Sequence, residues 1–181
     1  MSIFSMRREQ GFTVIEILVV MAIVVLMTIL VLPNWRAGEQ SLALQRSAQK
    51  LAQDTRRAQE LALRAQSFTC QIGTISGYGI FFDQSAPNSY ILFAECNGNN
   101  TYNDGIDGIV DGESISLESG VEIASVTPGP TVSIVFIPPT PTIWINNDVG
   151  QTSVQVVLRR TGDPASTKTI TITNKGIIDV D

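Results

Sequence analysis

The chain has 181 residues, a formal net charge of −5, no histidine and two cysteines. This length suits one domain together with an anchoring segment. The absence of histidine removes the commonest acid/base group and metal ligand, and no nucleophile–base pair can be identified, so the composition argues against an enzyme.

The charge is unevenly distributed along the chain. Residues 36–64 contain six basic and three acidic side chains, whereas residues 65–181 contain four basic and twelve acidic ones. An acidic C-terminal part argues against a surface that binds phosphate, so nucleic acid is not an expected partner.

The N-terminus combines a short leader, residues 1–11, with an apolar run at residues 12–35. The run supplies 24 positions with Glu16 as the only charge, and about 20 apolar residues suffice to cross a bilayer. A charge in such a segment costs roughly 2.5 kcal/mol or more and marks a functional position by default. Arg7 and Arg8 place the leader in the cytoplasm and the rest of the chain outside.

The candidate processing point lies between Gly11 and Phe12, ahead of the apolar run. An ordinary secretory signal has its apolar region before the cleavage site. Cleavage at Gly11 instead leaves the whole helix on the mature protein and creates an amine at Phe12, one helical turn from Glu16. A plain single-pass anchor with an isolated Glu is the alternative interpretation.

This order of residues resembles the type IV pilin and type II secretion pseudopilin superfamily, and the matching positions are Gly11, Phe12, Thr13, Glu16, the apolar run and Pro33. The resemblance implies that a prepilin peptidase cleaves after Gly11 and methylates the new N-terminal Phe12. It also implies that Glu16 pairs with the N-terminal amine of a neighbouring subunit, and a buried carboxylate is tolerable when it is paired. The implied partners are the peptidase, an inner-membrane assembly platform, membrane lipid before assembly, and other pilin or pseudopilin subunits in a helical filament.

The helix is predicted to continue beyond the apolar run. Pro33 removes a backbone donor and favours a kink. Residues 36–66 then show an amphipathic pattern with a stripe at three- and four-residue spacing: Leu44, Ala48, Leu51, Ala58, Leu61, Ala62 and Ala65. A helix of about 50 residues would extend about 75 Å, which suits a filament subunit.

From residue 67 the pattern changes to short strands separated by turn signals. Strands are predicted at Phe68–Ile72, Tyr78–Phe82, Tyr90–Ala94, Ser114–Leu117, Val121–Val126, Val132–Ile137, Thr142–Ile145, Val154–Arg159, Lys168–Thr173 and Ile177–Val180, with a hairpin turn at 174–176. The predicted fold class is α+β. Its organisation is a leader at 1–11, a transmembrane or filament-core helix at 12–35, an amphipathic continuation at 36–66, and an antiparallel β-sheet head at 67–181 on which the long helix packs.

The two cysteines, Cys70 and Cys96, lie beside predicted strand ends. Because the head is expected outside the cytoplasm, where disulfides persist, we hypothesise a bond between them. Two buried thiols are the alternative.

The tract from Glu95 to Glu113 is rich in Asn, Gly and Asp. Ca²⁺ prefers six to eight oxygen ligands, and glycines let a loop wrap around the ion. The hypothetical ligands are Asp104, Asp107 and Asp111. The order of an EF-hand loop is not met, and an ordinary surface loop is the favoured alternative.

Within the superfamily the head most resembles the GspH and Fim-type group of minor pseudopilins and minor pilins. The resemblance covers residues 58–68, the strands at 78–82 and 90–93, and the closing segment at 170–178. Some members bind DNA through arginines near the C-terminus, whereas residues 174–181 here contain one Lys and two Asp. The expected function is that of a structural minor pilin or pseudopilin, and a filament-borne DNA- or ligand-binding subunit of an uptake system is the alternative. The expected location is the cytoplasmic membrane, with a single span and the head outside, and then a filament.

Overall fold

The computed structural model describes residues 11–139 and 142–181, and it leaves out the side chains of residues 31–37. The chain divides into two compact units, Met1–Glu39 and Gln40–Asp181. Residues 1–10 of the predicted leader fall outside the described residues, and the predicted kink at Pro33 and the end of the predicted span at residue 35 fall within residues 31–37, whose side chains are not described.

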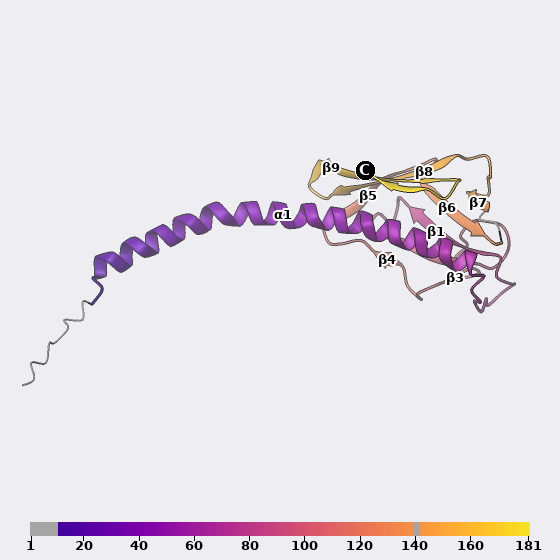
Figure 1. Cartoon of the computed structure of the whole chain (residues 1–181), viewed down its shortest axis with the longest axis horizontal. Coiled ribbons are helices and arrows are strands. Elements are labelled where there is room, and N and C mark those ends of the chain that lie inside the picture. The colour runs from indigo at the N-terminus through magenta and orange to yellow at the C-terminus, as the bar shows by residue number, and fades with distance from the viewer. Residues whose placement is uncertain (1–10, 140–141) are drawn as a thin grey trace, which may run out of the picture. The chain divides into compact units, whose positions relative to one another are not determined.

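Helix α1 spans Val14–Leu63, a length of 50 residues that agrees with the predicted long helix (Figure 1). It begins two residues later than expected because Thr13 caps it. The backbone N–H of Glu16 donates to the Thr13 hydroxyl at 3.3 Å, which satisfies one of the free donors of the first turn.

The helix ends before the predicted Gln66 because Ala65 takes a left-handed conformation with φ of 44°. The N–H of Gln66 donates to the carbonyl of Leu61, and the N–H of Ala65 donates to the carbonyl of Ala62. This pair of bonds is a Schellman motif, which provides hydrogen-bond donors to otherwise free carbonyls of the last turn.

A six-stranded antiparallel sheet, which we name sheet A, has the order β3-β2-β1-β6-β7, with β4 also paired to β2. Its strands are β1 (Gly77–Asp83), β2 (Ser89–Glu95), β3 (Gly108–Ile109), β4 (Ile115–Ser116), β6 (Thr131–Ile137) and β7 (Thr142–Ile145). The pairing of β1 with β2 confirms the predicted adjacent strands in this region.

A second antiparallel sheet, sheet B, has four strands in the order β10-β9-β8-β5. They are β5 (Val121–Thr127), β8 (Ser153–Arg160), β9 (Asp163–Thr173) and β10 (Ile178–Val180). The predicted turn at 174–176 joins β9 to β10: the N–H of Gly176 donates to the carbonyl of Thr173, and Gly176 has φ of 80°.

The core of the second unit lies between the C-terminal half of α1 and both sheets. The predicted helix stripe is largely confirmed, because Leu44, Ala48, Leu51, Ala58 and Ala62 are buried. Small side chains in this stripe allow the helix backbone to approach the sheets closely. The α+β fold class is therefore confirmed, with the helix packed on antiparallel sheets.

The two faces of sheet A have different coverings. On one face Tyr78, Ile80 and Leu92 join the core beneath α1. On the other face the ring of Tyr102, from the β2–β3 loop, lies 4.9 Å from that of Phe81 and 5.3 Å from that of Phe93. Sheet A is thus buried on both faces, by the helix and by a loop.

One predicted strand is wrong and one short strand was not predicted. Residues 68–72 form no strand; instead the ring of Phe68 packs on Gly108, where a Cβ atom would lie 2.0 Å from the ring. Strand β3 has only two residues, too few to show an alternating pattern.

Candidate functional site

The first candidate site is the start of α1. Gly11 and Phe12 precede the helix; Phe12 is 81% exposed, and nothing lies within 4 Å of the position of a Cβ on Gly11. Glu16 lies in the first turn, three residues after the capping Thr13. Thr and Glu at this spacing match the capping box, in which the carboxylate can also satisfy the backbone N–H of the capping residue.

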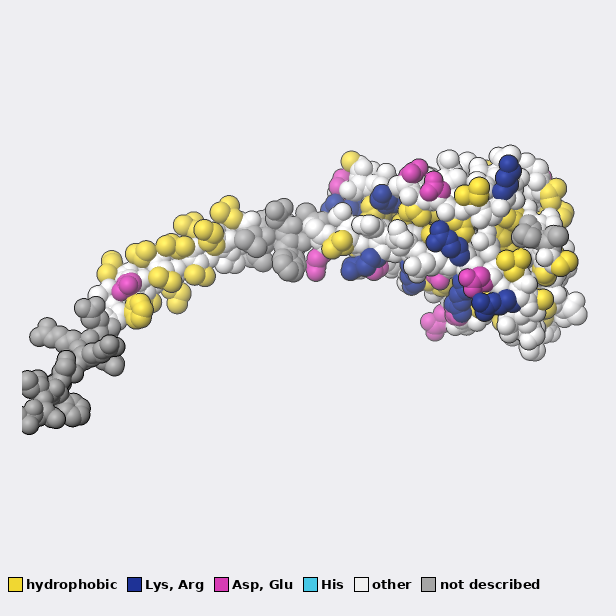
Figure 2. All heavy atoms as spheres, viewed as in Figure 1, with side chains coloured by type: hydrophobic (Ala, Val, Ile, Leu, Met, Phe, Trp, Pro, Cys, Tyr) yellow, Lys and Arg dark blue, Asp and Glu magenta, His cyan; other side chains and the backbone are white. Residues whose placement is uncertain are grey.

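The apolar side chains that follow are exposed around the whole helix. Those of Ile15, Leu18, Met21, Leu26 and Leu30 are each more than 60% exposed, and Figure 2 shows hydrophobic side chains along the visible side of this stretch. A helix that is apolar on all sides is stable when other apolar groups cover it.

Among the residues that the structure describes, no helix is both long enough and apolar enough to span a membrane.

The second candidate site surrounds the two cysteines. Cys70 and Cys96 form a disulfide that joins the segment after α1 to the end of β2. Cys96 is buried, and its N–H donates to Asp107 at 2.9 Å.

Carboxylates of the tract from Glu95 to Glu113 form hydrogen bonds with the backbone of the same tract. Asp107 accepts from the N–H of Cys96 through Oδ1 and from the N–H of Asn103 through Oδ2, at 2.9 and 2.7 Å. Glu95 Oε1 accepts from the N–H groups of Asn97 and Gly98, at 3.1 and 2.8 Å. These side chains pair with the backbone of an irregular loop, whose polar groups would otherwise be unsatisfied.

Glu95 is the most deeply buried carboxylate of the tract. Its side chain is fully inaccessible, and Oε2 has no hydrogen-bond partner within the described structure. Burial raises the pKa of Glu95, and the nearby charge of Asp107 raises it further, whereas the bond from Asn97 opposes the shift.

The predicted Ca²⁺ ligands are not brought together. Asp107 is occupied by backbone N–H groups, Asp111 forms two hydrogen bonds with Arg57, and Asp104 accepts from the hydroxyl of Tyr102 at 3.3 Å. No group of three or more Asp, Glu, His or Cys side chains suited to a metal ion occurs in the described part of the chain. The described structure therefore gives no support to a Ca²⁺ site at Asp104, Asp107 and Asp111, and that hypothesis stays a prediction.

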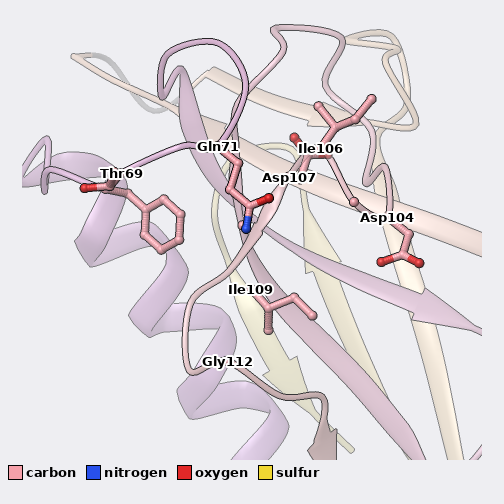
Figure 3. Close-up of a pocket in the computed structure, with 10 residues that line it drawn as sticks. Thr69, Gln71, Asp104, Ile106, Asp107, Ile109 and Gly112 are labelled. Carbon is pink, nitrogen blue, oxygen red and sulfur yellow. The ribbon is translucent and has the colours of Figure 1, made fainter.

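A cleft of about 330 Å³ lies beside this tract. Thr69 and Gln71 line it from the segment after α1, and Asp104, Ile106 and Ile109 line it from the segment after β2 (Figure 3). Its titratable lining groups are Asp104 and Asp107, and both oxygens of Asp107 already accept backbone hydrogen bonds. This lining offers no nucleophile–base pair.

A comparison with protein families finds a known motif at the N-terminus. The model of the prokaryotic N-terminal methylation motif matches residues 6–32. No curated protein and no solved structure matches the chain. The N-terminus thus carries the methylation motif of the type IV pilin and pseudopilin class, on an α+β, pilin-like architecture.

Three side-chain contacts of the described structure were not predicted from the sequence. Thr13 caps α1, Asp54 accepts from the hydroxyl of Tyr90 at 2.6 Å, and Asp111 binds Arg57. The cap could have been recognised from the Thr-x-x-Glu spacing. The partners of the other two contacts are far apart in the sequence, by 36 positions for Asp54 and Tyr90 and by 54 positions for Arg57 and Asp111. Such contacts leave no pattern in a short stretch of sequence.

Proposed function

We propose that this chain is a structural subunit of a type IV pilus or type II secretion pseudopilus, of the minor pilin or pseudopilin kind. A prepilin peptidase cleaves it after Gly11 and methylates Phe12, and the subunit enters the filament through its N-terminal helix. The observation that carries the proposal is the methylation motif at residues 6–32, whose helical part exposes apolar side chains from Val14 to Leu30.

In this proposal the helix lies in the cytoplasmic membrane before assembly and among other subunit helices afterwards. Both environments remove the apolar side chains from water, at roughly 25 cal/mol per Å² of area covered. The other partners are the prepilin peptidase and an inner-membrane assembly platform. We assign the chain no catalytic role.

Glu16 has two roles in the proposal, one within the chain and one between chains. Within the chain it occupies the third helical position after the capping Thr13. Between chains its carboxylate pairs with the Phe12 amine of the adjoining subunit, which is protonated in large part at neutral pH. An ion pair removes the cost of an isolated charge among apolar helices.

Three variants test the proposal and separate the two roles of Glu16. Glu16→Ala keeps the bond from the backbone N–H of residue 16 to Thr13 but removes the charge and the side-chain oxygens that can complete the capping box. Glu16→Gln keeps an oxygen for the capping box without the charge. Glu39→Ala is the matched control, an exposed Glu near the end of the first unit. Cleavage and methylation are measured by mass spectrometry of the N-terminus, and incorporation is measured in sheared filaments.

All three variants are expected to be cleaved. Glu16→Ala and Glu16→Gln should each lower incorporation about tenfold or more, since a buried charge would lose its partner, whereas Glu39→Ala should assemble normally. Normal assembly of Glu16→Gln would show that capping suffices and the intermolecular pair is wrong. A wild-type chain that keeps its leader, or never enters filaments, would reject the proposed function.

A further inference from the structure

The part of the chain that forms sheet A is acidic throughout. Residues 65–158, which include every strand of sheet A, contain nine Asp or Glu and no Lys or Arg. Arginines from elsewhere in the chain pair with Asp111, Glu118 and Glu122. Asp104 is exposed and forms no ion pair in the described structure. The charge of this stretch therefore favours a ligand that carries a cation.

The cleft of about 330 Å³ beside the disulfide lies between two segments of this acidic stretch (Figure 3). One wall is the segment 68–71 and the other is the segment 104–112. Both walls are tied to Cys96: the disulfide joins it to Cys70 in the first wall, and its N–H donates to Asp107 in the second wall at 2.9 Å. Walls that are already held together cost a ligand little ordering free energy.

The polar groups of the cleft have unused hydrogen-bonding capacity. The hydroxyl of Thr69 and the amide of Gln71 form no hydrogen bond within the described structure, and Asp104 accepts one, through Oδ1, which leaves Oδ2 free. Ile106 and Ile109 add apolar surface to the same lining. A carboxylate beside apolar surface suits a lysine or arginine side chain, which combines a charged end with an apolar stem.

The cleft also contains part of the open edge of sheet A. Strand β3 is the last strand in the order of this sheet, and the N–H of Val110 donates to the carbonyl of Leu92 on β2 at 2.9 Å. Bonded and non-bonded positions alternate in an antiparallel pair, so Ile109, opposite Phe93, directs its N–H and its carbonyl away from β2. The carbonyl accepts from Gly112 at 3.1 Å. The N–H of Ile109 thus remains for an added strand.

We propose that this cleft binds an extended peptide segment through a lysine or arginine side chain. The charged end of that side chain lies against Asp104, with the amide oxygen of Gln71 as a second acceptor. Its methylene stem lies along Ile106 and Ile109. A carbonyl of the bound segment accepts from the N–H of Ile109, so that the segment extends sheet A by one strand.

The partner in this proposal is a different polypeptide. Within residues 40–139 and 142–181, the basic side chains of this chain lie on α1, on the paired strands β8 and β9, or in the turn between β9 and β10. None of them lies in an extended segment that is free to pair with β3. Binding of this kind requires no filament and therefore goes beyond the proposed function.

The test measures peptide binding by isothermal titration calorimetry, with the purified full chain in micelles of an uncharged detergent. The probe is the pentapeptide Thr-Val-Lys-Val-Thr with both ends blocked, and the matched probe has Gln in place of Lys. We expect saturable binding of the Lys peptide that weakens as the salt concentration rises. The Gln peptide should bind about fivefold or more weakly. Nα-acetyl-lysine amide, which has the same side chain without flanking residues, should also bind about fivefold or more weakly.

Variants then test the position of the charge. Asp104→Asn should lower the affinity for the Lys peptide about fivefold or more. Asp148→Asn is the matched control, since Asp148 is exposed, lies outside the cleft and forms no ion pair in the described structure. Asp104→Lys should bind a peptide with Glu in place of Lys better than the original probe. Thermal melting checks that each variant is folded.

A photo-reactive benzophenone in place of one valine of the probe locates the bound peptide. We expect attachment within residues 68–71 or 104–112, read out by mass spectrometry of the digested protein. Attachment elsewhere would overturn the proposal.

Four calorimetric results would also overturn it: no saturable binding, equal affinity for the Lys and Gln peptides, equal affinity for the single lysine derivative, or an unchanged affinity in Asp104→Asn. Binding of glucosamine without binding of the peptide would show that the cleft takes a saccharide and that the proposal is wrong. These measurements use the isolated chain, whereas the proposed function is judged by the methylated chain in filaments. Either proposal can fail while the other stands.

Discussion

The guanidinium of Arg57 and the carboxylate of Asp111 form two parallel hydrogen bonds, 2.7 Å from Nη1 to Oδ2 and 2.8 Å from Nη2 to Oδ1. They tie α1 to the segment after β3. The hydrogen bond with Asp111 raises the pKa of Arg57, so the carboxylate of Asp111 is engaged by a side chain of α1.

Asp111→Asn is expected to lower the free energy of unfolding by less than about 1 kcal/mol, because both side chains are more than 40% exposed and water screens the pair. The loss, measured by urea denaturation, should shrink as the salt concentration rises. Glu113→Gln, in the same tract and without an ion pair in the described structure, is the control. Equal losses in the two variants would contradict a specific role of the Arg57 pair.

Ca²⁺ and a chelator are expected to leave the melting temperature unchanged. A ligand that binds only the folded state raises its stability, and the carboxylates of Asp107 and Asp111 are already engaged by protein donors. Melts with excess Ca²⁺ and with excess chelator check this. A reproducible upward shift with Ca²⁺ would show that a site exists.

Removing the Tyr90 hydroxyl should be more costly than removing an exposed one. Tyr90 is 2% exposed and donates to Asp54 at 2.6 Å; burial, followed by this bond, raises the pKa of Tyr90. Tyr90→Phe should cost about 1.5 kcal/mol, since bonds to charged groups are among the stronger ones. Tyr102→Phe, whose hydroxyl lies 3.3 Å from the exposed Asp104, should change stability by less than about 0.5 kcal/mol.

Glu95 should make stability depend on pH. Burial raises its pKa in the folded state above that of the unfolded chain, so the folded state holds the proton to higher pH. Protonated Glu95 makes its full contribution to the free energy of unfolding at pH values below its pKa in the unfolded chain. That contribution is lost as the pH rises through its pKa in the folded state. Glu95→Gln, which keeps an oxygen for the N–H groups of Asn97 and Gly98, should reduce this fall. Urea denaturation at a series of pH values from 4 upward measures this fall in stability. An equally large fall in Glu95→Gln would contradict its assignment to Glu95.

The elements with many repeated contacts could be predicted from sequence. The spacing of Leu44, Ala48 and Leu51 indicated the buried helix face, and short apolar runs bounded by turn signals indicated the strands at Tyr78–Phe82 and Tyr90–Ala94. Each of these patterns extends over several neighbouring residues, so it is visible in the sequence itself.

The Asn- and Asp-rich tract could not be interpreted in this way. The same oxygen-bearing residues can bind a cation or satisfy backbone N–H groups. The choice depends on where the tract lies, here across sheet A with Tyr102 packed on Phe93. Strand β3 depends on that placement too, because its two residues, Gly108 and Ile109, pair with Ala94 and Phe93 of β2.

Ala65 is a position where a substitution should stabilise the protein. It closes α1 with φ of 44°, a conformation that costs a non-glycine residue roughly 1 kcal/mol through the contact between its Cβ and the backbone. Ala65→Gly should therefore raise the free energy of unfolding, by up to about 1 kcal/mol, less the extra entropy that glycine gives the unfolded chain. Ala62→Gly is the control: Ala62 is buried on the helix, so the same change should destabilise by about 1 kcal/mol or more. Urea denaturation measures the change in the free energy of unfolding for both variants, which should have opposite signs. Destabilisation by Ala65→Gly would show that the Schellman geometry at this end of α1 imposes no strain.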